Sequence, residues 1–302
     1  MIAYNHYIKF IPEFKNDKKV KSTFIDTITV KENISTTLED KLLNKLTFAN
    51  NQGRDISLYS DIEFAHTEEG QFWAFEVKDI MTLFWYSGRL ELEYTKHENF
   101  TESLLEYWCL HIVLPLFFTI EETYHFLHAG AVEIEGSPIL FAAHSMGGKS
   151  TMTDFFIKQG HTMVSDDKVG IENRNDSFYV VPSHPHQRPY RAKEDLGFFI
   201  ENIAANPKLV NSIYELEQAN KDDEVKITEL KGIDKFKSLR YASEINLYFL
   251  KPKRLEFLLK LAKKVKVYQV CVPWDLDRQH EVYNTICEHV KVSTHFQLKD
   301  TK

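Results

Sequence analysis

Hydrophobic and polar positions along the first hundred residues follow the period of strands. Short runs rich in β-branched and aromatic residues are separated by polar turns, and in the last run, residues 89–94, apolar and charged side chains alternate strictly. A period of two is typical of a strand that is buried on one face. We therefore predict a small β-rich N-terminal domain over residues 1–100, which packs on the rest of the protein or recognises its substrate. The other predicted strands cover residues 23–30, 55–59, 71–77 and 81–86.

The period changes to that of a helix after Thr101. Apolar residues between 104 and 112 recur at helical spacing, and Thr101 is a suitable residue to cap the helix N-terminus. This pattern predicts a helix that links the two halves of the chain, over residues 101–123. The most apolar window, residues 112–120, is too short to span a bilayer and contains a proline, so we interpret it as part of a buried helix.

Strands and helices alternate from residue 124 onward. An apolar run at 139–143 and a short strand at 162–165 enclose a helix-compatible segment at 151–158. Strands separated by helices predict an α/β core with helices packed against a largely parallel sheet. The elements predicted farther along the chain are a charged helical segment between 192 and 237, a strand at 245–250, a helix at 254–264, a strand at 265–272 and a final helix at 277–290.

Composition and charge narrow the class of protein. The chain has 302 residues, 43% hydrophobic and 27% charged, as expected of an ordinary soluble globular protein with one large or two modest domains. Its net charge of −7 argues against nonspecific binding to nucleic acid or to an anionic membrane, because both need clustered cations. Three cysteines lie far apart without metal-ligand spacing, and the first residues do not resemble a signal peptide. We therefore expect a cytoplasmic protein.

The loop that follows the apolar run at 139–143 carries the strongest chemical signal. It ends in Gly147-Gly148-Lys149-Ser150 and leads into the predicted helix, which is the strand–loop–helix setting of a phosphate-binding loop. Glycines let backbone N–H groups approach phosphate oxygens, and the helix N-terminus adds partial positive charge. Lys149 can reach the β- and γ-phosphates, and the hydroxyl of Ser150 can ligate Mg²⁺.

The loop departs from the standard pattern at one position. A glycine is expected five residues before Gly148, where this chain has Ala143. If that position needs a positive φ, alanine costs about 1–2 kcal/mol of strain. A Gly-Lys-Ser triplet alone also arises often by chance, so the phosphate site needs support from a second element.

Two adjacent carboxylates supply that second element. Asp166 and Asp167 follow the short strand at 162–165. Mg²⁺-dependent phosphoryl transfer needs one carboxylate near the metal and often another to accept the proton of the acceptor hydroxyl. Because adjacent parallel strands deliver their C-terminal ends to the same edge of a sheet, we expect this acidic pair to lie near Lys149. Without the Lys149 loop, a solvated turn would be the better interpretation.

The segment from His128 to Asp167 resembles the catalytic core of the HPr kinase/phosphorylase superfamily. The shared features are a histidine that opens the strand before the loop, the Gly-Lys-Ser loop, the Gly160-His161 pair, a short strand and the Asp-Asp pair, without a gap in spacing. The resemblance implies a P-loop-containing, HPr-kinase-like (PEP-carboxykinase-like) α/β core over residues 124–302. It also implies ATP and Mg²⁺ as cofactors.

The same resemblance implies a role for each of these side chains. Asp166 would be the general base that deprotonates the acceptor, with His128 close by to modulate it. Asp167 would hold Mg²⁺ together with Ser150, and Lys149 would bind the phosphates. The nucleotide-binding loop as a whole would comprise Ser145, Met146, Gly147, Gly148, Lys149, Ser150 and Thr151.

Other parts of the sequence separate this chain from the HPr kinases proper. His144 and Met146 stand where the family has an acidic residue and a glycine, and a Glu-Ile-Arg-Gly-Leu-Gly-like signature is absent downstream. Residues 181–191 are instead similar to a Pro-Ser-x-Pro-x-x-Arg segment of the shorter HPr-kinase-like serine kinases, of the lasso-peptide-kinase type. Some of those phosphorylate a serine of a precursor peptide. In that segment Arg188 is a candidate to stabilise the charge of the transferring group, and a surface arginine is the alternative.

These observations lead to one main hypothesis and two alternatives. The main hypothesis is an ATP- and Mg²⁺-dependent kinase that phosphorylates a hydroxyl, above all a serine of a peptide or protein. The first alternative, motivated by Ala143 and Met146, is a nucleotide-binding scaffold or regulatory module without turnover. The second is a small-molecule kinase or a carboxykinase-like enzyme. A homo-oligomer is compatible with the resemblance, because the superfamily often forms rings, while neither nucleic acid nor a membrane is expected as a partner.

Overall fold

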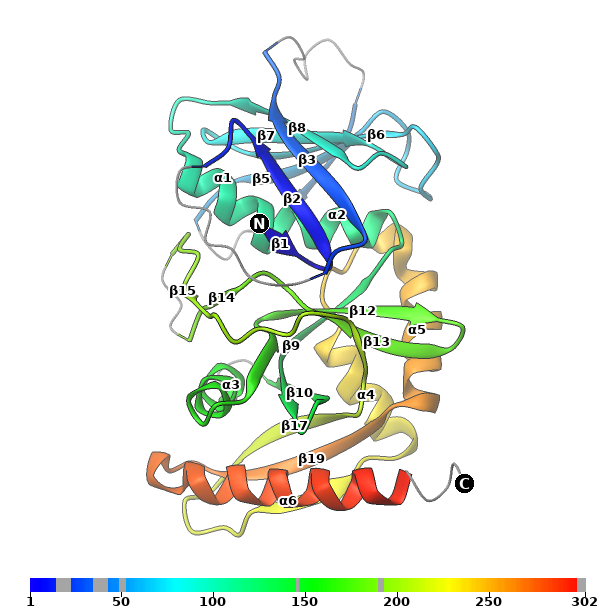
Figure 1. Ribbon diagram of the computed structural model, residues 1–302. Coiled ribbons are helices and arrows are strands. Elements are labelled where there is room, and N and C mark those ends of the chain that lie inside the picture. Colours follow the sequence, from blue (N-terminus) through cyan, green and yellow to red (C-terminus); the bar gives the residue numbers. More distant parts are fainter. Residues whose placement is uncertain (15–22, 35–42, 49–52, 145–146, 190–192, 298–302) are drawn as a thin grey trace.

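The chain folds into two β-sheets with a helix between them, and further helices pack around the second sheet (Figure 1). The computed structural model describes residues 1–14, 23–34, 43–48, 53–144, 147–189 and 193–297. Both sheets mix parallel and antiparallel pairs, so the protein is a mixed α/β structure. The first sheet and the helix come from the N-terminal part of the chain, and the second sheet from the remainder.

The first sheet has the strand order β1-β2-β3-β8-β7-β6-β5-β4. Strands β2, β3 and β8 run parallel to one another, whereas β8, β7, β6, β5 and β4 are antiparallel neighbours. In β8 the side chains of Leu92 and Tyr94 are buried and the glutamates beside them are not. The bounds are β1 Ile2–Ala3, β2 His6–Ile11, β3 Asp26–Glu32, β4 Asn44–Phe48, β5 Ile56–Ser60, β6 Phe72–Val77, β7 Met81–Tyr86 and β8 Glu91–Lys96.

The five strands predicted in this region are confirmed, as β3, β5, β6, β7 and β8. Their sequence pattern predicts them because each buries apolar side chains, either against the helix between the two sheets or against a neighbouring strand. The sequence gives no such signal for β4, since this edge strand has no fully buried residue. Burial of one face was not sufficient for prediction, because β2 buries Ile8 and Phe10 and was also missed.

The helix between the two sheets runs without a break from Glu102 to Ile120, and it confirms the predicted linking helix. Thr101 caps it, because its hydroxyl accepts a hydrogen bond from the Leu104 N–H at 3.2 Å. The stretch consists of α1 (Glu102–Trp108), a π-helical turn η2 (Cys109–Val113) and α2 (Leu114–Ile120). By length and composition it could cross a membrane, but 72% of its apolar window is buried inside the protein, as in a core helix.

The π-helical turn follows from a proline. Pro115 has no N–H and cannot donate to the carbonyl of His111, which removes one bond of the regular helical ladder. Just before Pro115, the backbone hydrogen bonds take the wider spacing of a π-helix: the Leu114 N–H donates to the Cys109 carbonyl, five residues earlier. The sequence predicted a helix here but gave no indication of the change in pitch.

The second sheet has the strand order β16-β13-β12-β9-β10-β17-β19-β18, and β11 pairs with β9. A separate pair is formed by β14 (His186–Gln187) and β15 (Phe198–Phe199). The bounds in the main sheet are β9 His125–Ile134, β10 Ser137–Ala143, β11 Thr162–Ser165, β12 Lys168–Arg174, β13 Ser177–Val181, β16 Lys208–Leu209, β17 Ser212–Ala219, β18 Lys226–Glu229 and β19 Lys266–Pro273.

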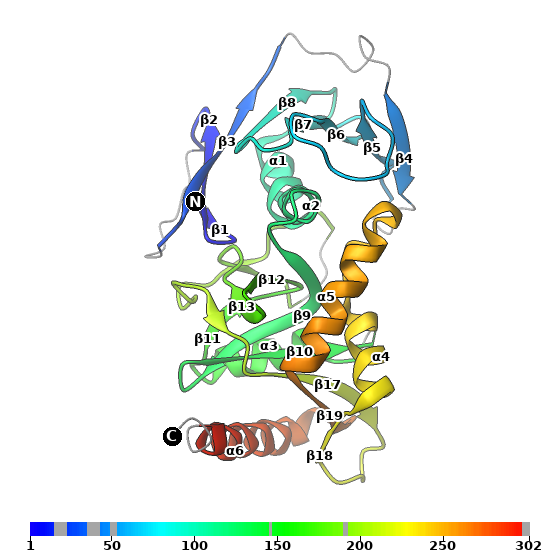
Figure 2. The same ribbon diagram turned by 90° about the vertical axis from the view of Figure 1, so that its right-hand side faces the viewer.

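Helices cover both faces of the second sheet (Figure 2). On one face, α4 and α5 bury Leu239 and Leu258 against alternate residues of β9 and β10. On the other face, α3 and α6 bury Phe156 and Ile286 against the intervening residues. The bounds are α3 Lys149–Lys158, α4 Gly232–Ala242, α5 Lys251–Lys264 and α6 Gln279–Gln297, with 3₁₀ turns η3 Tyr248–Leu250 and η4 Leu276–Arg278.

The prediction of a largely parallel sheet is wrong. Only β10–β17 and β17–β19 are parallel pairs, and every other pair that the structure describes in this sheet is antiparallel. Two-residue turns at 135–136 and 175–176, with positive φ at all four residues, close the β9–β10 and β12–β13 hairpins. Such short connections cannot make the crossover that parallel neighbours need.

Two further predictions are wrong. The segment between 192 and 237 contains the strands β15 to β18, and α4 begins only at Gly232. The glutamates of this segment suggested a charged helix. In strand β17, however, Ile213 and Leu216 are buried between β10 and β19, whereas Glu217 is exposed. The predicted strand at 245–250 is a 3₁₀ turn into α5, where Pro252 lies in the first helical turn and loses no hydrogen bond.

The other elements of the second half are confirmed. The run at 139–143 lies in β10, the segment at 151–158 lies in α3, and the strand at 162–165 is β11. The helix at 254–264, the strand at 265–272 and the final helix correspond to α5, β19 and α6. The division of the chain at residues 100 and 123 into a β-rich domain, a linking helix and a catalytic domain stays a prediction.

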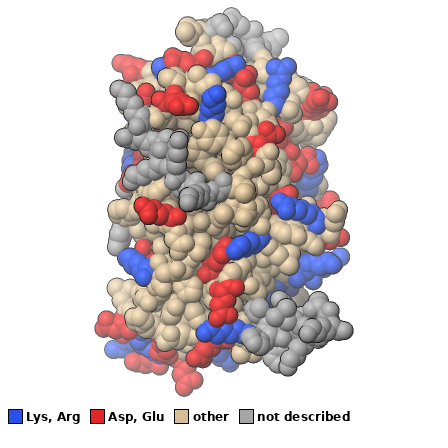
Figure 3. Space-filling view, viewed as in Figure 1, with Lys and Arg blue, Asp and Glu red and all other residues tan. Residues whose placement is uncertain are grey.

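Charged side chains of both signs are interspersed over the face of the molecule seen in Figure 3. On this face no extended cluster of lysine and arginine stands out among the residues that the figure describes. A mixture of both signs is compatible with the net charge of −7. The expectation that neither nucleic acid nor a membrane is a partner stays a prediction.

Helix α3 lies unusually close to β9. A Cβ atom added at Gly130 would come 2.0 Å from Oγ1 of Thr153, which is fully buried in α3. A glycine at this position therefore sets the distance between the sheet and the helix that begins with Lys149.

We expect Gly130→Ala to lower the free energy of unfolding by about 1–3 kcal/mol, because the added methyl overpacks the contact between β9 and α3. Gly170→Ala is the matched control, since its Cβ would meet Phe126 at 3.4 Å, an ordinary contact distance. Urea unfolding of both variants measures the difference. Equal stability of the two variants would contradict this account of Gly130.

Candidate active site

Strand β9 brings the predicted site residues together. It is flanked by β10 on one side and by β11 on the other, and it is antiparallel to both, so β10 and β11 run in the same direction. Their pairing with β9 ends at Ala129 and Ala131, which places the two chain exits at the same level. The loop after β10 and the acidic pair after β11 therefore meet beside β9. The expected proximity of Lys149 and the acidic pair is confirmed. The expected cause is wrong, because β10 and β11 are not adjacent and β9 runs antiparallel between them.

The acidic pair interrupts what would otherwise be one long strand. β11 ends at Ser165, opposite Ala131, and β12 begins at Lys168, opposite His128. In the break, Asp167 has a φ of +66°, and the Lys168 N–H donates to the Asp166 carbonyl at 2.8 Å. This tight turn presents both carboxylates to the loop before α3. Aspartate tolerates the left-handed conformation better than most residues.

The loop before α3 is compact. The Gly147 N–H donates to the His144 carbonyl at 2.8 Å, and Gly148, with φ +85°, is the N-cap of α3. Among the described residues, no side chain caps this helix end, so they leave the N–H groups of its first turn for another acceptor. Ala143 is the last residue of β10, pairs with Leu216 and has no positive φ, so the strain considered above does not arise there.

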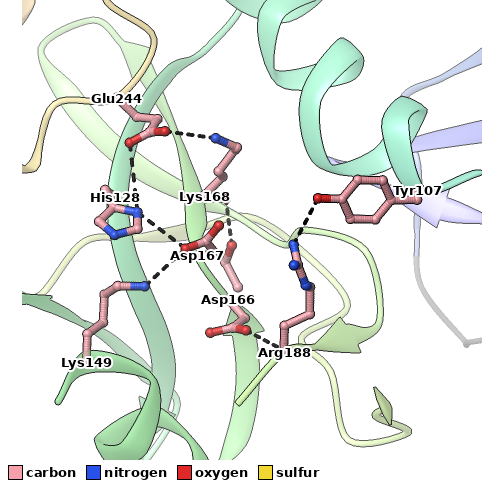
Figure 4. A network of polar contacts seen from close by, with 9 residues as sticks. Tyr107, His128, Lys149, Asp166, Asp167, Lys168, Arg188 and Glu244 are labelled. Atoms are coloured by element: carbon pink, nitrogen blue, oxygen red, sulfur yellow. Dashed lines mark hydrogen bonds and ion pairs between the residues drawn. The ribbon is translucent and has the colours of Figure 1, made fainter. Parts of the chain in front are cut away.

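Lys149 points from this loop toward the acidic pair (Figure 4). Its side chain is 6% exposed, and Nζ lies 3.4 Å from Oδ1 of Asp167. Burial alone would raise the pKa of the Asp167 carboxyl, but the charges of Lys149 and then Lys168 outweigh it and hold that pKa well below its usual range. Asp167 is therefore an ionised carboxylate facing an ammonium group.

Asp166 has a different environment from its neighbour. The Arg188 N–H donates to Oδ2 at 2.8 Å, while Oδ1 is buried and accepts no hydrogen bond from the described residues. Burial raises the pKa of this carboxyl above its ordinary value, against the opposing charge of Lys149. One oxygen is thus fixed by a hydrogen bond, and the other is a buried acceptor that no described residue satisfies.

His128 contacts the acidic pair from β9. Its Nδ1 lies 3.3 Å from Oδ1 of Asp167 and 3.8 Å from Oε2 of Glu244. Burial, and then the charge of Lys149, lower the pKa of His128, so the imidazole is neutral at neutral pH. Because an ionised carboxylate can only accept, Nδ1 carries the proton that faces Asp167.

Four residues beside the site were missed by the sequence analysis. Lys168 donates to Glu244 at 2.8 Å, and Tyr107 and His111 reach the site from the helix between the sheets. Lys168 could have been suspected because it follows the two aspartates directly. The other three lie far away along the chain and carry no motif.

Arg188 lies between the acidic pair and the linking helix (Figure 4). Its guanidinium is 5.2 Å from the centre of the Tyr107 ring, and Nη1 donates to the Tyr107 hydroxyl at 3.4 Å. The structure therefore places Arg188 at the site and not on an open surface. Arg191 of the same segment lies outside the described residues.

Several other predicted residues can be placed. Ser150 is half-buried and Thr151 is exposed in the first turn of α3, whereas Ser145 and Met146 lie outside the described residues. His144 is turned toward Glu215, with Nε2 3.7 Å from its carboxylate. His161 bonds the Glu133 carbonyl and the Tyr283 hydroxyl, at 3.0 Å each, which fits a structural role.

His184 and His186 are buried, and the ring of His184 lies beside that of His111. Burial lowers the pKa of His111 to about 3 and that of His184 well below its ordinary value, so both are neutral. In the part of the chain that the structure describes, no three His, Cys, Asp or Glu side chains are grouped to hold a metal ion. Mg²⁺ bound together with a nucleotide needs fewer protein ligands, because phosphate and water oxygens complete its shell.

The site fits a magnesium–nucleotide complex on three grounds. The uncapped N-terminus of α3 offers N–H groups, Lys149 offers an ammonium group, and Asp167 offers an ionised carboxylate. A Cβ at Gly147 would come within 2.9 Å of the His144 carbonyl, so the tight loop depends on glycine. These groups have the charges and positions that a triphosphate with its metal requires.

Comparison with known proteins adds a distant likeness in fold. No family model matches the chain, and no curated protein matches it. Among solved structures, the chain is similar to the HPr(Ser) kinase/phosphatase from Coxiella burnetii, with a TM-score of 0.32 and 14% identity, covering 59% of this chain and 99% of that one. A likeness at this level does not bear on function, which rests on the chemistry of the site.

Asparagine substitutions at the two aspartates are expected to change stability in opposite directions. Asp166→Asn removes a charge that burial disfavours, so the free energy of unfolding at pH 7 should rise. This gain is present above the raised pKa of the folded state and disappears as the pH falls through it toward the ordinary value of 3.8.

Asp167→Asn should lower the free energy of unfolding at pH 7, because the folded state holds the pKa of this carboxyl below 3.8. That loss shrinks as the pH falls below 3.8, where the unfolded chain already binds the proton. Urea unfolding at a series of pH values measures both curves. Shifts of the same sign for the two variants would contradict the electrostatic account of the pair.

Proposed function

We propose that the protein is an ATP- and Mg²⁺-dependent kinase that transfers the γ-phosphate to a hydroxyl group, above all to a serine of a peptide or protein. The observation that carries the proposal is the meeting of Lys149 and Asp167 at 3.4 Å beside a buried Asp166 with a raised pKa. A phosphate-binding cation, a metal-binding carboxylate and a proton acceptor are the three groups that phosphoryl transfer needs.

Each residue has a defined task in this proposal. Magnesium-bound ATP supplies the phosphoryl group that is transferred. Lys149 and the N–H groups of the first turn of α3 bind its phosphates, while Asp167 and the hydroxyl of Ser150 hold the metal. When Lys149 binds a phosphate and Asp167 binds the metal, the direct contact between the two side chains is replaced. The neutral His128 keeps the Asp167 carboxylate oriented through its Nδ1 proton.

Asp166 accepts the proton of the acceptor hydroxyl at Oδ1. Its Oδ2 is fixed by the Arg188 N–H, and a raised pKa makes the carboxylate a stronger base than an exposed aspartate. Because Oδ1 is buried, an acceptor reaches it only when a neighbouring side chain moves. Arg188, held against the Tyr107 ring, is close enough to the acidic pair to bind the transferring phosphoryl group.

The choice of serine as acceptor is supported by the likeness of residues 181–188 to the shorter HPr-kinase-like serine kinases. The alternative of a nucleotide-binding module without turnover is favoured by one observation, the burial of Asp166 Oδ1. A module needs Lys149 and the helix N-terminus but not a proton acceptor. The two functions therefore differ in what they demand of Asp166.

Transfer of labelled γ-phosphate from ATP to serine-containing peptides, with slow ATP hydrolysis as a second readout, tests the proposal. Asp166→Asn is expected to lower transfer by roughly 10²–10⁴-fold and to leave ATP binding intact, because general-base catalysis contributes about that much. Lys149→Ala is expected to weaken ATP binding as well as transfer. Lys158→Ala, at the exposed end of the same helix, is the matched control and should change neither.

Calorimetry with ATP and Mg²⁺ decides among the outcomes. Binding without phosphoryl transfer to peptide or to water would favour the module. Transfer that survives Asp166→Asn undiminished would contradict the proposed base. Absence of any ATP binding would overturn both candidate functions.

A further inference from the structure

An open pocket adjoins the loop before α3, on the side away from the acidic pair. Its cavity volume is about 230 Å³, and it lies between the start of α3 and the turn that connects β19 to α6. In Figure 1 this turn lies below α3. Gly148 and Thr151 line it on one side, and Trp274, Leu276 and Gln279 on the other.

The pocket and the acidic pair lie on different sides of the same helix end. Thr151 follows Lys149 by two positions, which corresponds to about 200° of rotation around an α-helix. Lys149 faces Asp167, and Thr151 is exposed and faces the pocket. A ligand whose phosphates cross the N-terminus of α3, with the last one near Lys149, would therefore continue into the pocket.

The wall of the pocket is suited to a flat aromatic ring. Trp274 is 51% exposed, whereas Trp73, Trp85 and Trp108, which are the other tryptophans of the chain, are at most 1% exposed. A Cβ at Gly148 would lie 3.7 Å from the indole of Trp274, so the ring stands at contact distance from the loop. Exposed tryptophan beside an apolar hollow is typical of a ligand site.

Polar groups at the edge would orient such a ring. Gln279 carries both a donor and an acceptor on its side-chain amide, and it lines the same pocket. Asp275 is already engaged, because its carboxylate accepts from the Asp277 N–H at 3.0 Å and caps the η4 turn. The turn that carries Trp274 is thus held in place by its own hydrogen bonds.

We propose that this pocket binds the nucleoside of the triphosphate, with the base stacked on Trp274 and its polar edge toward Gln279. The inference rests on the proposed function, since it assumes that the loop before α3 binds the phosphates. It adds the binding site for the base, which the sequence does not indicate.

Calorimetric titration with magnesium-bound ATP and with magnesium-bound tripolyphosphate tests the assignment. Trp274→Ala is expected to weaken ATP binding by about 10- to 100-fold, as loss of one base–aromatic stack does, and to leave tripolyphosphate binding unchanged. Trp274→Phe should retain most of the affinity for ATP. Tyr248→Ala removes another exposed aromatic side chain, 60% exposed and outside this pocket, and should change neither affinity.

Fluorescence gives an independent readout, because Trp274 is the tryptophan that a solution quencher can reach. ATP should protect the wild-type protein from quenching by acrylamide, and tripolyphosphate should not. If ATP and tripolyphosphate bind equally and Trp274→Ala changes neither, the pocket assignment is overturned while the proposed function stands. If the wild-type protein binds neither compound, the proposed function fails and the assignment fails with it.

Discussion

The arrangement of the site depends on the contact between the Lys149 ammonium and the Asp167 carboxylate, 3.4 Å apart. The two groups come from different strands, β10 and β11, and they meet because β9 runs antiparallel between those strands. Gly130 lets α3 approach β9, and Asp167 adopts a left-handed backbone in the break between β11 and β12. Removal of either backbone feature would move one charge away from the other, at a place where burial makes an unpaired charge costly.

The same cation acts differently on the two neighbouring carboxylates. The charges of Lys149 and Lys168 overcome burial at Asp167 and keep it ionised, whereas burial dominates at Asp166 and raises its pKa. Two adjacent residues of one type thereby differ in how readily they ionise. Oδ1 of Asp166 accepts no hydrogen bond from the described residues, and a buried acceptor without a donor costs stability.

The sequence predicted those parts of the molecule that depend on local pattern. Lys149, Asp166 and Asp167 were found because their residue types and spacing match phosphate and metal chemistry, whereas His128 was named only through the resemblance of this segment to a known family. The hairpins of the second sheet were not found, because no strand was predicted over β12 or β13 and the strands of the core were expected to be joined by helices, whereas two-residue turns join β9 to β10 and β12 to β13. Strand β17 was missed for a related reason: charged residues alternate with buried ones there, and only the pairing with β10 and β19 shows which are buried.

Contacts made across the fold left no trace in the sequence, and they connect the site to the N-terminal half. Tyr107 belongs to the linking helix, yet its hydroxyl and ring hold the Arg188 guanidinium. On the same helix Trp108 donates to Glu194 at 3.0 Å, and Glu194 also binds Arg54, which lies two residues before β5 of the first sheet. The position of Arg188 therefore depends on how the linking helix is packed between the two sheets. Because this helix contains the π-helical turn imposed by Pro115, its pitch at His111 is itself part of what places side chains beside the acidic pair.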